Sequence, residues 1–363
     1  MKSMKIKLNN LSNSVSYSKP LVIAGPCSAE SNLQMLSTAR ELKKTNTHIF
    51  RAGIWKPRTR PNSFEGVGTP ALEWMNNVQK ETGLKVITEV ANSTHVNKIL
   101  KHNIDMIWIG ARTVGNPFAI QEIVDSLKGV DMPIFIKNPL NADLNLWLGA
   151  IERFYNAGFR NIIAIHRGFF SYGIQKYRNM PQWQLPVELK RLIPELPIIC
   201  DPSHIAGNRS LINEISQTAL DLNFDGLMIE THIDPINALS DQEQQLNPIQ
   251  LNELLDNLVV RNQSDNNSET ALSLEYLRSQ IDKLDDKLID VLQNRMNLAE
   301  LIGLDKKAND ITILQPERWK FILEDRMKKG ITKGLSDEFV ILLLRAIHQE
   351  SINIQTKVMN SNK

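Results

Sequence analysis

The chain has 363 residues, and its 42 lysines and arginines nearly balance 40 aspartates and glutamates, for a formal net charge of +2. This length suits two domains, and the balanced charge argues against a general nucleic-acid or membrane-surface binder while allowing local basic pockets. The chain has only two cysteines, and residues 1–19 lack the apolar stretch of a signal peptide. No apolar run is long enough to span a bilayer. We therefore expect a cytoplasmic protein without nucleic-acid or membrane partners.

From residue 20 to residue 260, short apolar runs alternate with helix-length amphipathic segments. The eight runs are Leu21–Ala24, His48–Ala52, Lys85–Glu89, Met106–Ile109, Pro133–Lys137, Asn161–His166, Pro197–Asp201 and Asp225–Glu230. Such alternation indicates a parallel sheet, and eight units in about 240 residues predict a (β/α)₈ barrel of the TIM type. An open doubly wound sheet is the weaker alternative, because no glycine-rich dinucleotide loop follows the first run.

The pattern changes after residue 260. Residues 261–271 are polar and rich in Asn and Ser, which predicts a linker between a barrel domain at 20–260 and a helical domain at 272–363. Residues 1–19 form an N-terminal extension in this division.

Three helices are expected in the C-terminal domain. Apolar residues at spacings of three and four predict a long first helix over 272–307, followed by helices over 316–329 and 336–359. Ser336 and the acidic residues after it are a typical start signal for the last helix. Three helices have little core of their own, so we expect partner helices from a second protomer.

The predicted strands bring chemically capable side chains to one end of the barrel, where the active sites of such barrels lie. These residues are Cys27, Arg51, Lys56, Glu89, Arg112, Lys137, His166, Arg167, Asp201, His204 and Glu230. Any one of them alone is more often a solvated or structural residue. Together, five cations around one cavity repel one another unless anions neutralise them. The pattern therefore predicts a substrate with several negative charges, such as phosphates and a carboxylate.

The same end of the barrel offers metal ligands. Cys27, His204 and Glu230 supply a sulfur, an imidazole and a carboxylate, and Asp241 lies just beyond the last strand to complete the set. Such a mixed set suits one divalent transition metal ion (Mn, Fe, Co or Zn) rather than calcium or magnesium. Cys200 lies inside the seventh run and is expected to be structural.

Seven strings along the barrel carry a specific resemblance. They are AGPCSAES (24–31), RAGIWKPRT (51–59), GAR (110–112), IKNP (136–139), HRGF (166–169), DPSHIAG (201–207) and IETHIDP (229–235). In this order they resemble 3-deoxy-D-arabino-heptulosonate 7-phosphate (DAHP) synthase, in the branch related to 3-deoxy-D-manno-octulosonate 8-phosphate synthase. The KPRT string at 56–59 favours the heptulosonate enzyme. An octulosonate synthase with a dimerising tail is the alternative.

This resemblance implies a metal-dependent condensation of phosphoenolpyruvate with erythrose 4-phosphate, the first step of the shikimate pathway. It implies the metal ligands Cys27, His204, Glu230 and Asp241. It implies a phosphoenolpyruvate site formed by Arg51, Lys56, Arg112, Lys137 and Arg167, with Arg58 and Thr59 for the aldose phosphate. Lys56 counts among the catalytic candidates, as do Glu89 and His166 for positioning water or moving protons. Residues 113–117 depart from the polar run that the family often has after GAR.

The helical domain carries a second resemblance. The strings LRSQIDKLDDKLIDVLQNR (277–295), IG (302–303) and HQES (348–351) resemble the all-helical chorismate mutase family. The resemblance implies rearrangement of chorismate to prephenate without a metal, with Arg295, Lys306 and Gln355 as the catalytic candidates. The substrate-binding candidates are Arg278, Arg295, Lys306, Arg318, Ser351 and Gln355. The chain departs from the family at Trp319, where Glu is frequent, and at Gln315, where an acid is common.

The spacing of two arginines predicts a shared site. Arg278 and Arg295 are 17 residues apart, which is about 25 Å along one helix and too far for one chorismate. A ligand would meet Arg295 of one chain and Arg278 of an antiparallel partner, so we expect a homodimer or a larger oligomer. A plain dimerisation tail and a catalytically silent domain that binds chorismate or prephenate are the alternatives. We also hypothesise that this domain is a feedback sensor for the barrel.

Overall fold

The structure is a computed structural model, and it describes residues 6–9, 19–57, 63–173, 176–261 and 268–361. Its internal contacts divide the chain into two compact units, Met1–Gln263 and Ser264–Lys363, called here the barrel unit and the helical unit. Among the described residues, no helix is long and apolar enough to cross a membrane.

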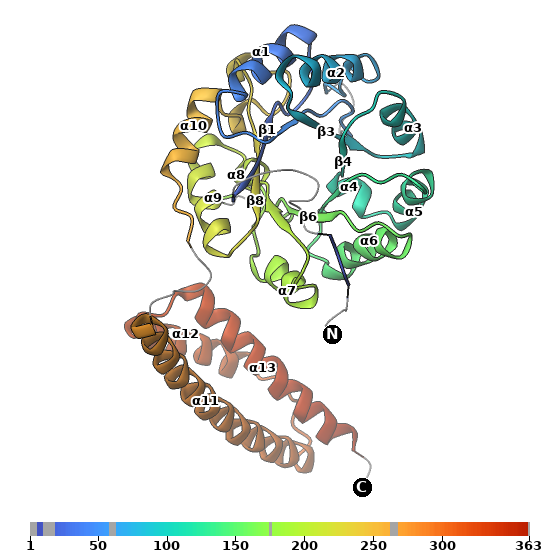
Figure 1. Cartoon of the computed structure of the whole chain (residues 1–363). Helices are drawn as coiled ribbons and strands as arrows, with labels where there is room; N and C mark the ends of the chain where they lie inside the picture. Colours follow the sequence, from blue (N-terminus) through green and yellow to red (C-terminus); the bar gives the residue numbers. More distant parts are fainter. Residues whose placement is uncertain (1–5, 10–18, 58–62, 174–175, 262–267, 362–363) are drawn as a thin grey trace. The chain divides into compact units, whose positions relative to one another are not determined.

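In the barrel unit, parallel strands close into a barrel, each pairing with the next in sequence and the last with the first (Figure 1). The strands are β1 Leu21–Gly25, β2 Ile49–Arg51, β3 Lys85–Val90, β4 Met106–Ile109, β5 Ile134–Lys137, β6 Ile162–His166, β7 Ile198–Cys200 and β8 Gly226–Glu230. Every apolar run identified in the sequence forms one of these strands. The closed sheet confirms the barrel and excludes the open doubly wound alternative.

Helices surround this barrel in Figure 1. They are α1 Asn32–Leu42, α2 Pro70–Thr82, α3 Ser93–Lys101, α4 Ala111–Val114, α5 Pro117–Ser126, α6 Leu144–Asn156, α7 Gln184–Leu192, α8 Pro202–Ala206, α9 Ile212–Asp221 and α10 Pro248–Asn257. Several begin with a side-chain cap: the Ser31 side chain accepts from the backbone of Gln34, and Asn247 and Gln250 form a capping box at α10. Such caps satisfy backbone donors that the first turn of a helix leaves without partners.

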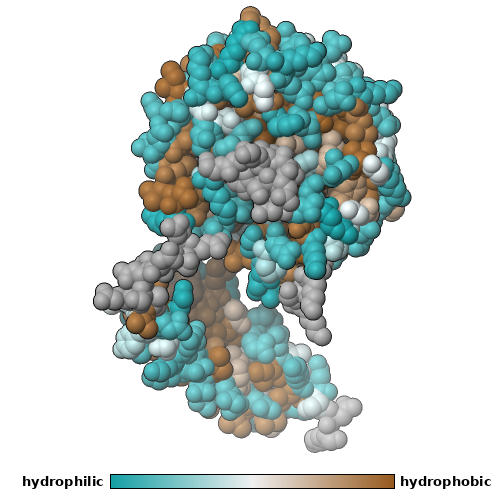
Figure 2. All heavy atoms as spheres, viewed as in Figure 1, coloured by the Kyte–Doolittle hydropathy of each residue, from teal (hydrophilic) through white to brown (hydrophobic). Residues whose placement is uncertain are grey.

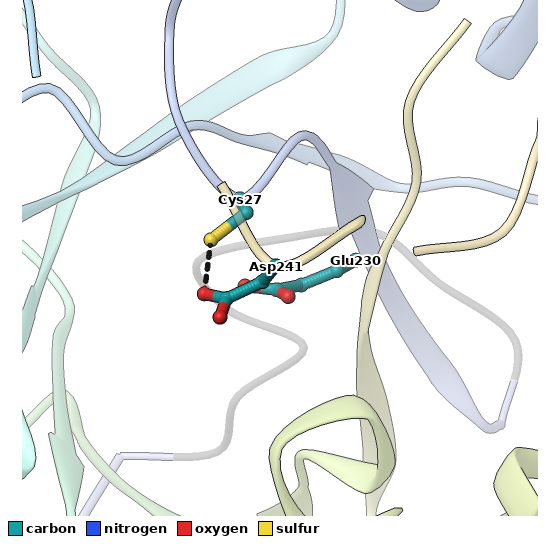
Figure 3. A group of neighbouring side chains, drawn as sticks. All are labelled: Cys27, Glu230 and Asp241. Carbon is teal, nitrogen blue, oxygen red and sulfur yellow. Dashed lines mark hydrogen bonds between the residues drawn. The ribbon is translucent and has the colours of Figure 1, made fainter. Parts of the chain in front are cut away.

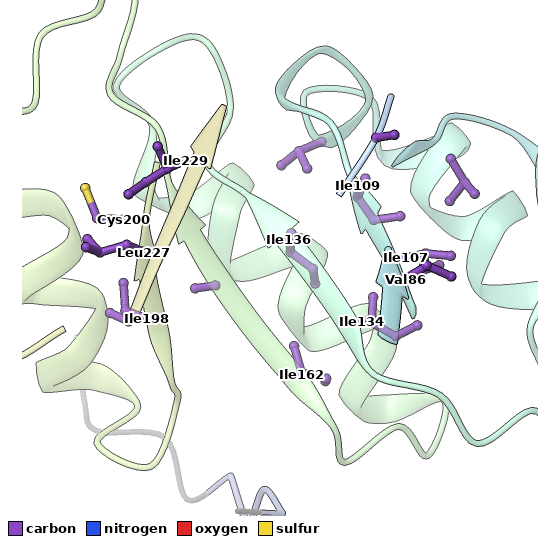
Figure 4. Packing of buried hydrophobic residues seen from close by; sticks show 14 of the residues in the cluster. Val86, Ile107, Ile109, Ile134, Ile136, Ile162, Ile198, Cys200, Leu227 and Ile229 are labelled. Carbon is purple, nitrogen blue, oxygen red and sulfur yellow. The ribbon is translucent and has the colours of Figure 1, made fainter. Parts of the chain in front are cut away.

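Alternate residues of each strand belong to two different cores. Outward-facing residues, among them Val86, Ile109, Ile136, Leu227 and Ile229, pack under the helices (Figure 4). Cys200 belongs to this outer core, as expected of a structural cysteine. The inward-facing residues form a separate cluster that fills the barrel interior: Leu21, Ile23, Ile49, Ile87, Met106, Trp108, Phe135, Ile163, Ile165, Ile199 and Met228.

The barrel closes where β8 and β1 meet, and one glycine permits their close approach. Gly226 pairs with Leu21 in register, and a Cβ added to it would lie 2.2 Å from the Leu21 carbonyl oxygen. Any larger residue at this position would push the two strands apart.

The helical unit consists of α11 Ser268–Ala308, α12 Pro316–Thr332 and α13 Asp337–Asn360, in agreement with the three helices expected from the apolar spacing. Helix α13 packs against both α11 and α12. Gly303 allows the first of these contacts, because an added Cβ would lie 3.1 Å from Cγ of Gln355. Of the predicted linker, residues 262–267 lie outside the described part of the chain.

Helix α11 carries an apolar stripe that the unit itself does not cover. Leu277, Ile281, Leu284, Leu288 and Val291, called here the α11 stripe, recur at spacings of four and three and are each 49–63% exposed. Hydrophobic atoms reach the surface of the helical unit among hydrophilic ones in Figure 2. A stripe with this period is typical of a helix that packs against another helix.

Candidate active sites

The charged side chains of the barrel mouth follow from the alternation of residues along each strand. The last inward-facing apolar residues of six strands are Ile49, Ile87, Phe135, Ile165, Ile199 and Met228. The inward position two residues later is charged in every one of them: Arg51, Glu89, Lys137, Arg167, Asp201 and Glu230. Because the strands are parallel, these side chains come to the same end of the barrel.

His166 faces the other way. It directly precedes Arg167 and therefore points to the outer side of β6. Its buried imidazole lies 5.2–6.4 Å, between ring centroids, from four aromatic rings, those of Trp147, Phe169, Trp183 and Phe224. Burial above all, with repulsion from Arg167, lowers its pKa to about 3. Contrary to the sequence-based expectation, the side chain belongs to the layer between sheet and helices and not to the mouth.

Glu89 is held in place by a residue of the neighbouring strand. Nε1 of Trp108 donates a hydrogen bond of 2.8 Å to its carboxylate. Gly110 provides the room that Glu89 needs, because a Cβ there would lie 2.1 Å from Oε1 of Glu89. The Trp108 ring also faces two cations, with the Arg51 guanidinium 4.9 Å and the Lys137 ammonium 5.7 Å from its centroid. These contacts suit cation–π attraction in a buried site.

Three metal-competent side chains meet beside this mouth. Cys27 follows β1, Glu230 ends β8, and Asp241 lies in the segment after β8; their ligand atoms all lie within 4.8 Å of one another (Figure 3). The Cys27 thiol donates to Asp241 over 2.9 Å. Asp241 has a φ of 49°, a left-handed conformation that Asp adopts more readily than most residues. The donor set of thiol and carboxylates is the kind that binds divalent transition metals.

His204 lies next to this group without being part of it. Its Nε2 is 3.7 Å from Oε1 of Glu230, and its Nδ1 is 2.9 Å from Oδ2 of Asp201. A hydrogen-bonded carboxylate behind a histidine fixes the ring orientation, as is usual for metal-ligating histidines. The structure thus assembles three of the four predicted ligands and places the fourth beside Glu230.

Opposing charges shape the acid–base properties of this group. Burial, together with repulsion from Glu230, raises the pKa of the Cys27 thiol. Burial alone would raise the pKa of the Asp241 carboxyl, but Lys56, His204 and Arg178 together hold it well below its ordinary value. The Lys56 ammonium lies 2.6 Å from the Cys27 sulfur, where it favours an anionic ligand set.

A cavity at the mouth is lined by five cations, namely Lys56, Arg112, Lys137, Arg167 and Arg178, together with Glu89, His204 and Asp241. Some of these cations have carboxylate partners: Lys137 binds Asp201 over 2.8 Å, and Arg178 binds Asp241 over 2.9 Å. Arg167 bonds to neutral groups, and burial, with repulsion from Arg178 and Arg112, lowers its pKa to about 10. The crowding of cations indicates a site for an anion.

Arg51 is buried beside Glu230 and has unused donors. Its Nη2 is 3.2 Å from Glu230, while its Nε and Nη1 atoms have no hydrogen-bond partner among the described residues. A buried guanidinium with two free donor atoms destabilises the fold unless a ligand supplies the acceptors.

Arg178 is the residue that the sequence analysis missed. It donates to both Asp241 and Gln244, over 2.9 and 2.7 Å, and it lines the cavity. Gln244 in turn donates to Glu230 over 2.6 Å. Arg178 lies in the segment between β6 and α7, far from a strand end, so the reasoning from strand ends had no means of finding it.

The helical unit brings two of its six predicted binding residues, Arg295 and Ser351, into contact and buries two more, Lys306 and Gln355. Nη1 of Arg295 donates to the Ser351 hydroxyl over 2.6 Å, and Lys306 donates to the backbone of Ile313 over 2.6 Å. Lys306, Ser351 and Gln355 are buried, and Oε1 of Gln355 has no hydrogen-bond partner among the described residues.

The remaining predicted residues lie elsewhere. Arg278 is exposed on α11, 17 residues before Arg295, and Arg318 is exposed on α12 with its guanidinium over the Phe321 ring. Arg58 and Thr59 of the barrel lie outside the described residues.

A parallel barrel whose mouth combines cations with a thiol–carboxylate cluster is typical of an enzyme that acts on anionic substrates, and the cluster could hold a metal ion. The chain belongs to the DAHP synthetase I family, whose model matches residues 13–264. Residues 277–356 match the model of chorismate mutase type II.

Individual relatives are similar to about two thirds of the chain. A phospho-2-dehydro-3-deoxyheptonate aldolase of Thermotoga maritima is 31% identical over 62% of this chain and 64% of its own length. A 2-dehydro-3-deoxyphosphooctonate aldolase of Campylobacter jejuni is 26% identical over 66% of this chain and 96% of its own. A crystal structure of the DAHP synthase of T. maritima superposes with a TM-score of 0.61 at 30% identity, covering 69% of this chain and 72% of that one.

The contacts of Arg178 lead to a first prediction. Replacing Arg178 with Ala removes the donor that holds Asp241 and Gln244, and we expect the affinity for a divalent metal such as Mn²⁺ to fall roughly ten- to a hundredfold. Isothermal titration of metal-free protein measures this affinity. Lys176→Ala is the matched control, because Lys176 lies two residues away and binds the exposed Glu214. Equal affinities in wild type and Arg178→Ala would contradict the assignment.

Proposed function

We propose that the barrel unit condenses phosphoenolpyruvate with erythrose 4-phosphate to DAHP and inorganic phosphate. The observation that carries this proposal is the cavity with five cations beside the Cys27, Glu230 and Asp241 group. Both substrates are phosphorylated, and phosphoenolpyruvate also carries a carboxylate, so their charges suit a site with this excess of cations. The KPRT string and the heptulosonate relative support erythrose 4-phosphate over arabinose 5-phosphate as the acceptor sugar.

The roles proposed for the residues follow from their places in the cavity. Lys137, Arg167 and Arg112 bind the phosphate and carboxylate of the enol phosphate, while Arg51 supplies its two free donor atoms. Holding both substrates in line brings C3 of the enol phosphate to the aldehyde carbon, where the new carbon–carbon bond forms. Water then adds at C2, and the phosphate leaves from that carbon. Glu89, oriented by Trp108, is the candidate to position this water or accept its proton.

The family is metal-dependent, and the residues present fit a divalent transition metal. We propose Cys27, Glu230, Asp241 and His204 as its ligands, with Lys56 next to the sulfur to favour the thiolate. When bound, such an ion supplies Lewis-acid polarisation of the aldehyde oxygen. A thiol ligand must stay reduced, which supports a cytoplasmic location for the protein.

Metal removal tests the synthase proposal. We expect chelation to abolish the condensation, and Cys27→Ala to do the same because it removes a ligand; Cys200→Ala, a buried cysteine of the outer core, is the control. The assay follows phosphate release with erythrose 4-phosphate or arabinose 5-phosphate as acceptor. Full activity in metal-free protein would overturn the metal proposal, and a clear preference for arabinose 5-phosphate would make the barrel an octulosonate synthase.

For the helical unit, we propose the rearrangement of chorismate to prephenate in a site shared by two copies. Arg295 and Lys306 bind the carboxylates, and Gln355 stabilises the charge that develops on the breaking ether oxygen. The α11 stripe supports a second copy as partner, because five apolar residues on one face are otherwise left exposed. Arg278 borders this stripe in sequence, so an antiparallel partner would bring it to the site.

Variants of two arginines test this shared site. Arg295→Ala should lower the mutase rate by roughly a hundredfold, the scale for losing a charge-stabilising donor. Arg278→Ala should also inactivate the mutase. Mixing the two variants should restore activity, because a heterodimer has one site in which both arginines are intact. No restoration, after exchange of subunits has been demonstrated, would contradict the shared site. Arg326→Ala on α12, exposed and paired with Asp325, is the control.

A regulatory role for the helical unit stays a prediction. If this unit senses the mutase ligand for the barrel, prephenate should inhibit the synthase in the full chain, and Arg295→Ala should be insensitive while keeping its synthase rate without prephenate. By linkage, the barrel substrates must weaken prephenate binding by the same factor. Synthase rates against prephenate concentration measure the effect; equal inhibition of wild type and variant would contradict the sensor role.

A further inference from the structure

Two side chains of the helical unit stack face to face between α12 and α13. Trp319 of α12 and His348 of α13 have ring centroids 3.9 Å apart and an interplanar angle of 8°. Trp319 follows Arg318, and His348 begins the HQES string. The stack joins two helices through flat rings, and this fixes the orientation of the imidazole.

The His348 ring has an unused polar atom close to the mutase residues. Its Nε2 is buried and has no hydrogen-bond partner within the described parts of the chain, and the same holds for Oε1 of Gln355, seven residues later on α13. Two such atoms on one helix indicate that something outside the chain completes their hydrogen bonds.

The charge of the imidazole limits which chemical group can complete its hydrogen bond. Burial, with repulsion from Arg295 and Lys306, lowers the pKa of His348, which favours the neutral ring. A neutral imidazole offers one N–H and one lone pair. It suits a hydroxyl group, which can both donate and accept, better than a carboxylate, for which the neighbouring cations are stronger partners.

The polar groups of chorismate can then be assigned in turn. The molecule has two carboxylates, an ether oxygen and one ring hydroxyl. Arg295 and Lys306 account for carboxylates and Gln355 for the ether oxygen, which leaves the hydroxyl without a partner and Nε2 of His348 without a ligand. We infer that His348, positioned by Trp319, contacts the substrate by hydrogen-bonding the ring hydroxyl of chorismate; this inference rests on the mutase activity proposed above.

Removing the His348 imidazole and the ring hydroxyl of chorismate, separately and together, tests this contact. The measurement is kcat/KM of wild type and of His348→Leu, each with chorismate and with an analogue whose ring hydroxyl is replaced by hydrogen. In wild type, the loss of the hydroxyl should cost roughly tenfold, because a buried polar atom is left unpaired. His348→Leu should lose a similar factor with chorismate and little more with the analogue, since the contact is already gone.

Conservative variants separate contact from structure. His348→Gln keeps a hydrogen-bonding side chain and should regain part of the sensitivity to the hydroxyl. Trp319→Phe keeps a flat ring and should preserve that sensitivity, whereas Trp319→Ala should reduce it. Gln349→Leu is the matched control, because Gln349 follows His348 but is exposed and donates to Asn353. Its kcat/KM with chorismate and with the analogue should equal those of wild type.

The outcomes are distinguishable. If wild type has the same kcat/KM for chorismate and for the analogue, the inference fails. This result needs no variant, so it does not depend on whether His348→Leu folds. If wild type discriminates but His348→Leu discriminates equally, another residue contacts the hydroxyl and the inference again fails. If wild type neither converts nor binds chorismate, the proposed mutase function itself fails, and this appears before any variant is made.

Discussion

The pairing of buried cations with buried carboxylates at the barrel mouth is the interaction on which the rest of this site depends. Asp201 neutralises Lys137, and Glu230 accepts from Arg51; Asp241 accepts from Arg178, whose side chain is 49% exposed. Either member of the two buried pairs, left alone in this setting, would carry a large desolvation cost. A closed parallel sheet makes the pairing possible, because it directs charged residues from separate strands to one end.

The alternation of strand residues explains how much of the barrel site could be predicted. The apolar runs located the strands to within about one residue, because buried parallel strands consist of little else. Arg51, Lys137 and Glu230 then followed as strand-end residues. His166 and Arg167 were both assigned to the mouth, although neighbouring residues of a strand face opposite sides. Arg178 was missed because its place depends on the path of a loop, which apolar spacing does not describe.

The helical unit was predictable in its helices and less so in its site. Spacings of three and four predicted the first helix, and the resemblance pointed to Arg295 and Ser351, which α11 and α13 bring together, and to Gln355, which packs against Gly303. The Trp319–His348 stack could not be foreseen, because the two residues lie 29 positions apart and on different helices. The departure at Trp319 indicated only that the family's usual side chain was missing there, and not what replaces it.

The two units solve the binding of anions in different ways. In the barrel, acids from the same chain neutralise several cations before any ligand binds, so the site is assembled by the fold itself. In the helical unit, Arg295 and Lys306 bond to a hydroxyl and a carbonyl, neither of which carries a charge. Neither cation forms an ion pair within the described part of the chain, so a ligand with negative charge would be the first partner to neutralise them. A helical unit with exposed apolar residues and unneutralised cations therefore gains more from a second copy and a bound dianion than the barrel does. For this reason, we expect its stability to respond more strongly to its ligand than that of the barrel responds to phosphoenolpyruvate.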